Sequence, residues 1–414
     1  MDTNNIDTGR LRISVTQEDS YIPISNARIE ISSASSPDKP IEVIQTNSSG
    51  NTETVELDAP PLEYSMEPSD NQPYSEYTLK LTAQDFDNQI ITGVQIFPSV
   101  IGIQNISLTR TKGTIPVYNP IVIDGHTLWE YYPPKIAEPE IKPLNESGEI
   151  VLRRVVVPET IVVHDGVPGD QTAPDYYVPY LDYIKNVASC EIYSTWPEAT
   201  IQANVLAIMS FTLNRVYTEW YRNKGYNFTI TSSTAYDHKW IRGKTIYDSI
   251  SKVVDSLYDN FLARPNVKQP ILTQYCDGKR VTCPNWMSQW GSKYLGDDGL
   301  SAIEIIRYYY GNNMYINSAE LISGIPASYP GYDLSIGSSG EAVLQIQEQL
   351  ARIRQVYTAI PALSTDGIYG QQTAASVKAF QEIFGLPASG IVDYPTWYKI
   401  SQIYVGITKI AENV

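Results

Sequence analysis

The sequence predicts a multidomain α+β protein with an N-terminal antiparallel β-sandwich, a central α+β catalytic domain and a C-terminal three-helix bundle. Three patterns support this fold class: short runs of period two near the N-terminus, a long apolar helical pattern in the middle, and helical stripes near the C-terminus. A chain of 414 residues is long enough for two or three domains with separate cores.

The first predicted unit spans residues 1–111. From about Gly9 to Thr111, apolar and polar residues alternate in short runs such as 11–15, 27–31 and 77–81. Turns rich in Asn, Gly, Ser and Pro separate these runs. Alternation with regular turn signals is typical of an antiparallel β-sandwich. We expect this unit to have a regulatory or propeptide role.

The next stretch, residues 112–154, loses this periodicity and is crowded with prolines. They stand at Pro116, Pro120, Pro133, Pro134, Pro139 and Pro143. Proline has no N–H group and disfavours regular structure in the residue before it. The stretch is therefore predicted to be a linker, an extended cover segment or a propeptide.

The central unit, residues 155–325, contains the most informative residue of the chain, Glu191. Apolar residues recur at helical spacing from Tyr180 to Ala188, and Glu191 follows Ile184 by seven positions, on the same buried stripe. A buried carboxyl group keeps its proton more readily, which suits a general acid. The alternative is a glutamate at a helix end that turns to water. A second, very apolar helix follows Trp196 and is predicted to be the buried helix of the domain.

The last unit, residues 332–414, follows a boundary with proline and glycine at 326–331 that few contacts are expected to cross. Val343, Ile346 and Leu350 form one helical stripe and Val377, Phe380 and Phe384 form another, as in a small bundle. These residues are predicted to be core. Binding would be carried by turn residues expected to be exposed, Asp366, Tyr369 and Gln372.

Composition excludes several classes of protein. Acidic residues outnumber basic ones by 46 to 30, so a general attraction to nucleic acid or to an anionic membrane is not expected. The first seven residues contain neither a basic region nor an apolar run, and we expect no signal peptide and no membrane span. No cofactor is expected.

The three cysteines leave two readings open. Cys276 and Cys283 stand seven apart in a polar turn and could form a disulfide or offer two thiolates to a metal. The chain holds only His126, His164 and His238 to complete a metal site, so none is expected. Cys190 precedes Glu191 and is expected to be a small buried residue rather than a nucleophile.

The segment from Val178 to Arg215 resembles the catalytic core of the stage II sporulation protein D family of peptidoglycan lytic transglycosylases. It reads VPYLDYIKNVASCE and continues into a long apolar helix, and the family's catalytic glutamate falls on Glu191. The runs 231–236 (TSSTAY), 287–291 (MSQWG) and 305–311 (IIRYYYG) also resemble family segments. The likeness implies that Tyr236, Ser288 and Gln289 position substrate. The family's glycine- and histidine-rich run is replaced here by 283–286 (CPNW).

The C-terminal unit resembles the three-helix peptidoglycan-binding domain of many cell-wall hydrolases, through 336–343 (IGSSGEAV), 365–370 (TDGIYG) and 380–386 (FQEIFGL). Together the three units resemble the germination-specific spore cortex-lytic enzymes of spore-forming anaerobes. That likeness implies a location at the spore cortex, cortex peptidoglycan as partner, and an inactive precursor that a protease activates, with a mature part that begins near 155–159. Polar and flexible residues in the linker predict that the cleavage falls between Asn145 and Pro158. Two alternatives remain open: a non-catalytic wall-binding scaffold and an N-acetylmuramoyl-L-alanine amidase.

Overall fold

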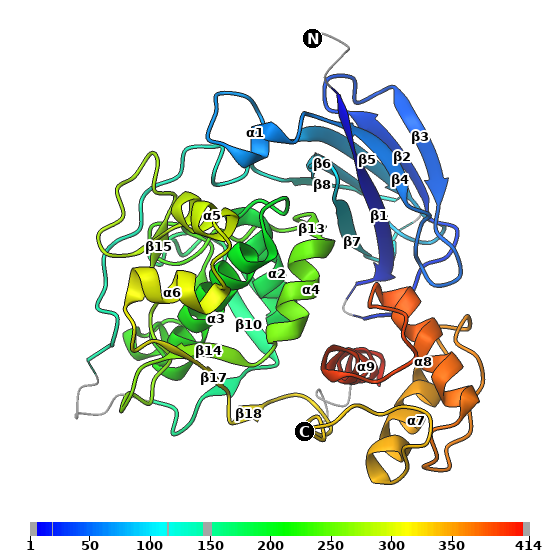
Figure 1. Cartoon of the computed structure of the whole chain (residues 1–414). Coiled ribbons are helices and arrows are strands. Elements are labelled where there is room, and N and C mark those ends of the chain that lie inside the picture. Colours follow the sequence, from blue (N-terminus) through cyan, green and yellow to red (C-terminus); the bar gives the residue numbers. More distant parts are fainter. Residues whose placement is uncertain (1–5, 19, 114–115, 144–150, 409–414) are drawn as a thin grey trace.

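The computed structural model describes residues 6–18, 20–113, 116–143 and 151–408. It is a mixed α+β protein, in agreement with the predicted class. An N-terminal unit of two sheets lies beside a helix-rich middle unit, and three C-terminal helices lie below both (Figure 1). Most buried apolar residues of the N-terminal unit form one cluster, and most of those of the middle unit and the C-terminal helices form another. A small third cluster contains Val162, Tyr221 and Phe228.

Two sheets build the N-terminal unit. The first has the strand order β13-β7-β1-β4, with β1 (Asp7–Gln17), β4 (Val55–Ala59), β7 (Ile101–Leu108) and β13 (Ile246–Tyr247). The second has the order β3-β2-β5-β6-β8, with β2 (Arg28–Ser33), β3 (Pro40–Gln45), β5 (Ser75–Thr82), β6 (Asn88–Ile96) and β8 (Tyr118–Val122). Alternate residues of β1, such as Leu11 and Ile13, are fully buried in one cluster with Ile29 and Leu79 of the second sheet. A short helix, α1 (Glu63–Met66), follows β4.

The prediction that these sheets are purely antiparallel is wrong. β1 runs parallel to β7, and β6 runs parallel to β8. Alternation of apolar and polar residues determines which face of a strand is buried but carries no information about the direction of its neighbour. β8 also lies within the stretch predicted as a linker, so the sheet continues past residue 111.

The middle unit is organised around α3 (Glu198–Tyr217), most of whose residues are buried. The helix begins after Pro197, whose missing N–H costs nothing at a helix start. The helices around it are α2 (Tyr180–Glu191), α4 (Asp248–Leu257), α5 (Gln289–Asp297) and α6 (Ala302–Tyr310), with a 3₁₀ turn at Arg222–Lys224.

Short strands complete this unit. β10 (Thr160–His164) pairs with β11 (Asp175–Pro179) and β12 (Ile230–Thr231), and β14 (Asn260–Ala263) pairs with β17 (Tyr315–Ser318). β15 (Tyr275–Cys276) pairs with β16 (Met287–Ser288), and β18 (Leu321–Ile322) pairs with β9 (Val156–Val157).

A shared sheet joins the N-terminal and middle units. β13 of the middle unit pairs antiparallel with β7, so that Ile246 lies opposite Ile103. The buried Gln104 side chain reinforces the junction: its Nε2 donates to the Gly243 carbonyl at 2.7 Å, and its Oε1 accepts from the Thr245 hydroxyl at 2.7 Å. The N-terminal unit is therefore joined to the middle unit by strand pairing and by side-chain hydrogen bonds.

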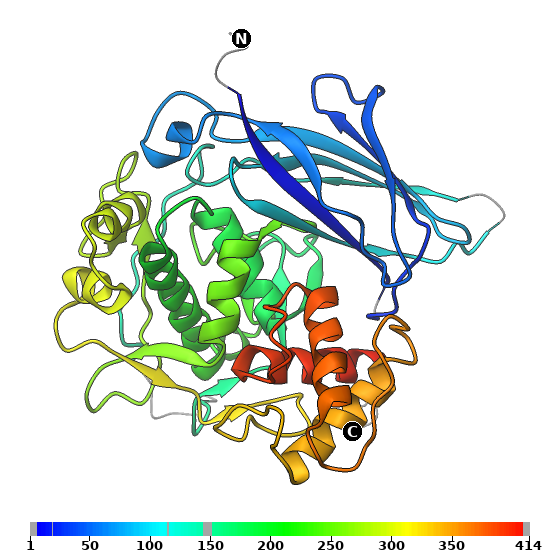
Figure 2. The ribbon, with the colours of Figure 1, turned by 45° about the vertical axis from the view of Figure 1, so that its right-hand side comes forward.

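The C-terminal unit consists of α7 (Glu341–Ile353), α8 (Gln371–Phe384) and α9 (Tyr394–Thr408). The predicted core residues Val343, Ile346, Leu350, Val377 and Phe380 are fully buried. Its contacts with the rest of the chain are more extensive than the boundary at 326–331 suggests (Figure 2). The Tyr398 ring stacks on Tyr258 of the middle unit with centroids 4.4 Å apart, and Asn51 Nδ2 donates to the Ile383 carbonyl at 2.9 Å.

Two buried glutamines make the same set of hydrogen bonds in this unit. Gln347 Oε1 accepts from the Gly367 N–H at 2.8 Å, and its Nε2 donates to the Ile368 carbonyl at 2.9 Å and the Thr373 hydroxyl at 3.0 Å. Gln381 makes the same three bonds to Gly390, Ile391 and Thr396, at 2.8, 2.8 and 3.0 Å. Each glutamine therefore fixes the turn that leads into the next helix.

Gln347→Ala is expected to destabilise this unit by about 1–3 kcal/mol, because it leaves buried backbone groups of the 366–368 turn without partners. Urea unfolding followed by circular dichroism measures the change. The exposed Gln372 provides a matched control, and Gln372→Ala should change stability by less than about 0.5 kcal/mol. Equal effects of the two substitutions would contradict the role given to Gln347.

Candidate active site

Glu191 is the last residue of α2 and is only 4% exposed. The spacing from Ile184 predicted this burial. The backbone leaves the helix in an extended conformation at Ile192, whose N–H still bonds to the Ala188 carbonyl. The Glu191 side chain is thereby held inside the unit instead of turning to water.

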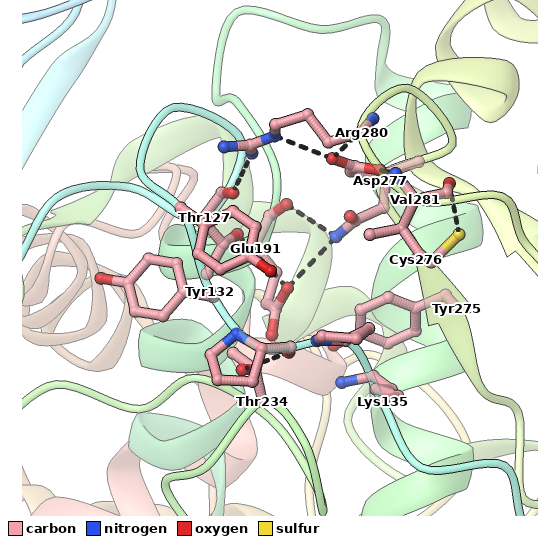
Figure 3. Close-up of a pocket in the computed structure, with 14 residues that line it drawn as sticks. Thr127, Tyr132, Lys135, Glu191, Thr234, Tyr275, Cys276, Asp277, Arg280 and Val281 are labelled. Carbon is pink, nitrogen blue, oxygen red and sulfur yellow. Dashed lines mark hydrogen bonds and ion pairs between the residues drawn. The ribbon is translucent and has the colours of Figure 1, made fainter.

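Three donors hold the Glu191 carboxylate, which lies at the cavity drawn in Figure 3. The backbone N–H of Lys239 donates to Oε1 at 2.9 Å. Gln289 Nε2 lies 3.3 Å from Oε2 and also donates to the Glu191 carbonyl at 2.8 Å, while the Thr127 hydroxyl lies 3.4 Å from Oε2. Buried carboxylates require such partners, and here the donors orient both oxygens at the edge of a cavity.

The cavity beside Glu191 has a volume of about 70 Å³. Its walls come from two stretches of chain, 127–135 and 275–281, and from the separate residues Thr234 and Gln289. Ligand pockets for small molecules have volumes of about 300–1,000 Å³. In the intact chain this cavity is therefore too small for a disaccharide.

Two ionisable side chains near Glu191 have shifted pKa values. Burial lowers the pKa of Lys135, although the carboxylates of Glu191 and Asp237 favour its charged form. Burial raises the pKa of Tyr275 well above its usual value, and the negative charge of Glu191 acts in the same direction. At neutral pH, the Tyr275 hydroxyl is therefore protonated and uncharged.

A disulfide closes the loop beside the cavity. Cys276 and Cys283 are bonded to each other, which decides between the two readings of this pair. Asp277 lies inside the loop, and its carboxylate accepts from three backbone N–H groups of the loop. The Asp277 carboxylate therefore stabilises the conformation of the loop. Cys190 is a free, buried thiol, and burial raises its pKa to about 12, so it does not form a nucleophilic thiolate at neutral pH.

The structure brings only some of the predicted substrate residues to the cavity. Gln289 contacts Glu191 directly. Ser288 caps α5 by accepting from the Gly291 N–H at 2.9 Å, and neither Ser288 nor Tyr236 lines the cavity. Tyr236 instead offers its backbone carbonyl to Arg215 at 3.0 Å.

The two residues proposed for wall binding differ in exposure. Tyr369 is 1% exposed and its hydroxyl donates to the Gly390 carbonyl at 2.9 Å, so the prediction of an exposed Tyr369 is wrong. Asp366 is exposed, and its carboxylate accepts from the Ile368 N–H, which lowers the pKa of Asp366.

Several residues at the cavity were not found from the sequence. Thr127, Tyr275 and Arg280 lie outside every segment that resembles the family. The Lys239 contact uses only a backbone N–H, which no residue type reveals. Thr234 lies inside the run 231–236, which is the one signal that pointed near the site.

Within residues 6–18, 20–113, 116–143 and 151–408, no three His, Cys, Asp or Glu side chains gather in a group that could bind a metal ion. In the same residues, no helix is both long enough and apolar enough to span a membrane.

The C-terminal unit is the part of the chain that matches a known family. Residues 339–400 match the family model "Putative peptidoglycan binding domain". The C-terminal unit is therefore similar to peptidoglycan-binding domains. Gln347, Gln381 and both turns they fix lie within the matched residues.

Two individual proteins are similar to parts of the chain. The zinc D-Ala-D-Ala carboxypeptidase of Streptomyces albus G is 45% identical over 71 residues, which are 17% of this chain and 26% of that protein. The chain thus matches only about a quarter of that relative. The crystal structure of the SleB N-terminal domain is 27% identical and aligns over 19% of this chain and 99% of that domain, with a TM-score of 0.17, too low to support a conclusion about the fold.

Proposed function

We propose that the protein is a lytic transglycosylase of spore cortex peptidoglycan that is made as a zymogen and acts in germination, similar to the cortex-lytic enzyme SleC. The observation that carries the proposal is Glu191, a buried carboxyl group held by three donors at the edge of a cavity. The peptidoglycan-binding domain on the same chain supports the choice of polymer.

A single carboxyl group suffices for this reaction. Glu191 protonates the glycosidic oxygen between muramic acid and glucosamine, and the C6 hydroxyl of the muramic acid attacks its own anomeric carbon. The resulting carboxylate takes the hydroxyl proton, which closes a 1,6-anhydro ring and restores the acid. No water is consumed.

The surroundings of Glu191 favour one acid over two. Most glycoside hydrolases use a second carboxylate as base or nucleophile. Among the residues that line the cavity, the other carboxylate is Asp277, and its oxygens accept from the backbone of Lys279, Arg280 and Val281. Asp277 is therefore committed to its loop.

The products of digestion test the reaction. Cortex peptidoglycan treated with the activated protein is expected to yield fragments with 1,6-anhydromuramic ends, identified by mass spectrometry. Reducing ends alone would indicate a hydrolase, and free stem peptides would indicate an amidase. Binding to sacculi without any released fragment would support the non-catalytic scaffold.

Wall affinity is expected to depend on the C-terminal unit. A chain that ends at Ile325 lacks α7, α8 and α9 and should pellet with insoluble peptidoglycan much less than the full chain. The truncation exposes the Tyr258 ring that Tyr398 covers, so circular dichroism must show that the remaining units stay folded. Unchanged pelleting of a folded truncated chain would mean that the middle unit binds the wall unaided.

Exposure favours one part of the window proposed for the activating cleavage. Residues 145–150 lie outside the described part of the chain. Arg153 and Arg154 are exposed, whereas Val155 and Val157 are buried beside β18. Proteases cut exposed chain, so we place the activating cleavage before Val155.

A further inference from the structure

One extended segment covers Glu191. We call residues 126–142 the strap; they run from β8 along the middle unit without forming a helix or a strand (Figure 1). Six strap residues line the cavity at Glu191: Thr127, Tyr131, Tyr132, Pro133, Pro134 and Lys135. The strap therefore forms a wall of the site whose acid is Glu191.

The first half of the strap is held next to the cavity. Arg280, from the disulfide-closed loop, donates to the carbonyls of Thr127 at 2.6 Å, Trp129 at 3.1 Å and Glu130 at 2.5 Å. The Thr234 hydroxyl donates to the Pro133 carbonyl at 2.9 Å. These bonds use strap backbone, so they hold the path of the segment rather than any one side chain.

The second half is anchored by charged side chains two residues apart. Glu138 accepts from Arg215, with 2.5 Å between Oε1 and the nearer guanidinium nitrogen, and Glu140 pairs with Arg264. The Lys142 ammonium lies 4.0 Å from the centroid of the Trp220 ring. Alternate residues of an extended chain point to the same side, so the three side chains all face the middle unit.

Backbone bonds lie between these anchors. Ile136 N–H donates to the Ala235 carbonyl at 2.7 Å, and the Gln274 side chain bonds to both Ile136 and Glu138. Leu272 N–H donates to the Glu140 carbonyl at 2.9 Å. Regular backbone bonds of this kind are typical of an extended peptide bound along a protein surface.

We propose that the strap occupies the groove in which the glycan strand binds, so that Glu191 is closed to polymer until the strap leaves. The inference rests on the function proposed above and adds where the inhibition lies. Under this proposal, cleavage of the chain and opening of the site are two separate events. The strap lies N-terminal to the proposed cleavage window but bonds to Arg215, Arg264 and Arg280, which lie C-terminal to it. A cut before Val155 therefore leaves these contacts in place, and opening requires that the strap dissociate from the middle unit.

Access of a thiol reagent to the cavity tests the proposal without relying on catalysis. In a full-length Cys190→Ala background, Thr234→Cys places a thiol of similar size against the strap at Pro133. Labelling should be slow in this chain. Adding Glu138→Ala and Glu140→Ala removes two strap anchors and should speed labelling by at least about tenfold, since labelling follows the open population. Ile141→Ser, at an exposed strap position, is the matched control and should leave labelling slow.

Further results support or overturn the proposal that the strap covers the site. Equal labelling of the chains with and without the anchors would overturn the proposal, as would fast labelling after nicking before Val155 with both fragments still associated. Glu191→Cys provides a second thiol if Thr234→Cys fails to fold, which circular dichroism reveals. The anchor-free chain with native Thr234, Cys190 and Glu191 should also release more glycan than the intact chain. Fast labelling with no glycan release would retain the strap as a cover and reject the transglycosylase.

Discussion

Glu191→Gln is expected to lower the release of glycan fragments by about 100-fold or more, the contribution typical of a general acid–base group. Glutamine keeps the size of the side chain and its carbonyl can still accept from the Lys239 N–H. It can neither donate a proton to the leaving oxygen nor take one from the C6 hydroxyl. Initial rates of cortex digestion by the activated protein measure the loss.

Two controls accompany this variant. Glu198→Gln changes an exposed glutamate in the first turn of α3 and should leave the rate unchanged. Pelleting of Glu191→Gln with sacculi should also match the unchanged protein, because the peptidoglycan-binding domain lies at 339–400. A variant that digests cortex at the normal rate would remove Glu191 from the mechanism.

The position of Glu191 could be predicted from the sequence because helical spacing reports burial. It follows Ile184 by seven residues, and both are buried, as are all residues of α2 except Asp182. Its partners could not be predicted in the same way. Lys239 contributes a backbone N–H and Thr127 comes from a segment 64 residues earlier in the chain, so neither leaves a local pattern.

The strap shows what proline content does and does not reveal. Prolines at 133, 134 and 139 correctly indicated a chain without helix or strand, but they carry no information about what an extended chain lies on. The missed signal was charge at period two. Glu138, Glu140 and Lys142 recur at the spacing of an extended segment with one face on protein, which free linkers do not need.

Tyr369 illustrates a different limit. A glycine-containing turn suggested exposure, yet the Tyr369 side chain leaves that turn inward, where its hydroxyl reaches the Gly390 carbonyl. A turn must be at the surface only in its backbone; an aromatic side chain can still bury most of its area. The large aromatic side chain of Tyr369 is therefore buried although its backbone belongs to a turn.

A buried ion network joins the strap to the middle unit. The Arg215 side chain is 0% exposed; its Nε donates to Asp237 Oδ1 at 2.7 Å, and its two terminal nitrogens reach Glu138. Burial alone would lower the pKa of Arg215, but the carboxylates of Asp237 and Glu138 outweigh burial and raise it. Asp237 is itself 0% exposed and accepts from the Tyr221 hydroxyl at 2.6 Å.

Arg215→Met is expected to destabilise the protein by about 3–5 kcal/mol, because it leaves the Asp237 charge buried without its cation. Methionine retains much of the apolar stem, so the loss reports the charge more than the volume. Urea unfolding at neutral pH measures it. Arg222→Met is the matched control: the Arg222 side chain is 52% exposed and lies 3.3 Å from Glu219, and pairs of this kind contribute about 0–1 kcal/mol. If both substitutions cost less than about 1 kcal/mol, the Asp237 carboxylate finds other compensation and the network does not hold the strap to the middle unit.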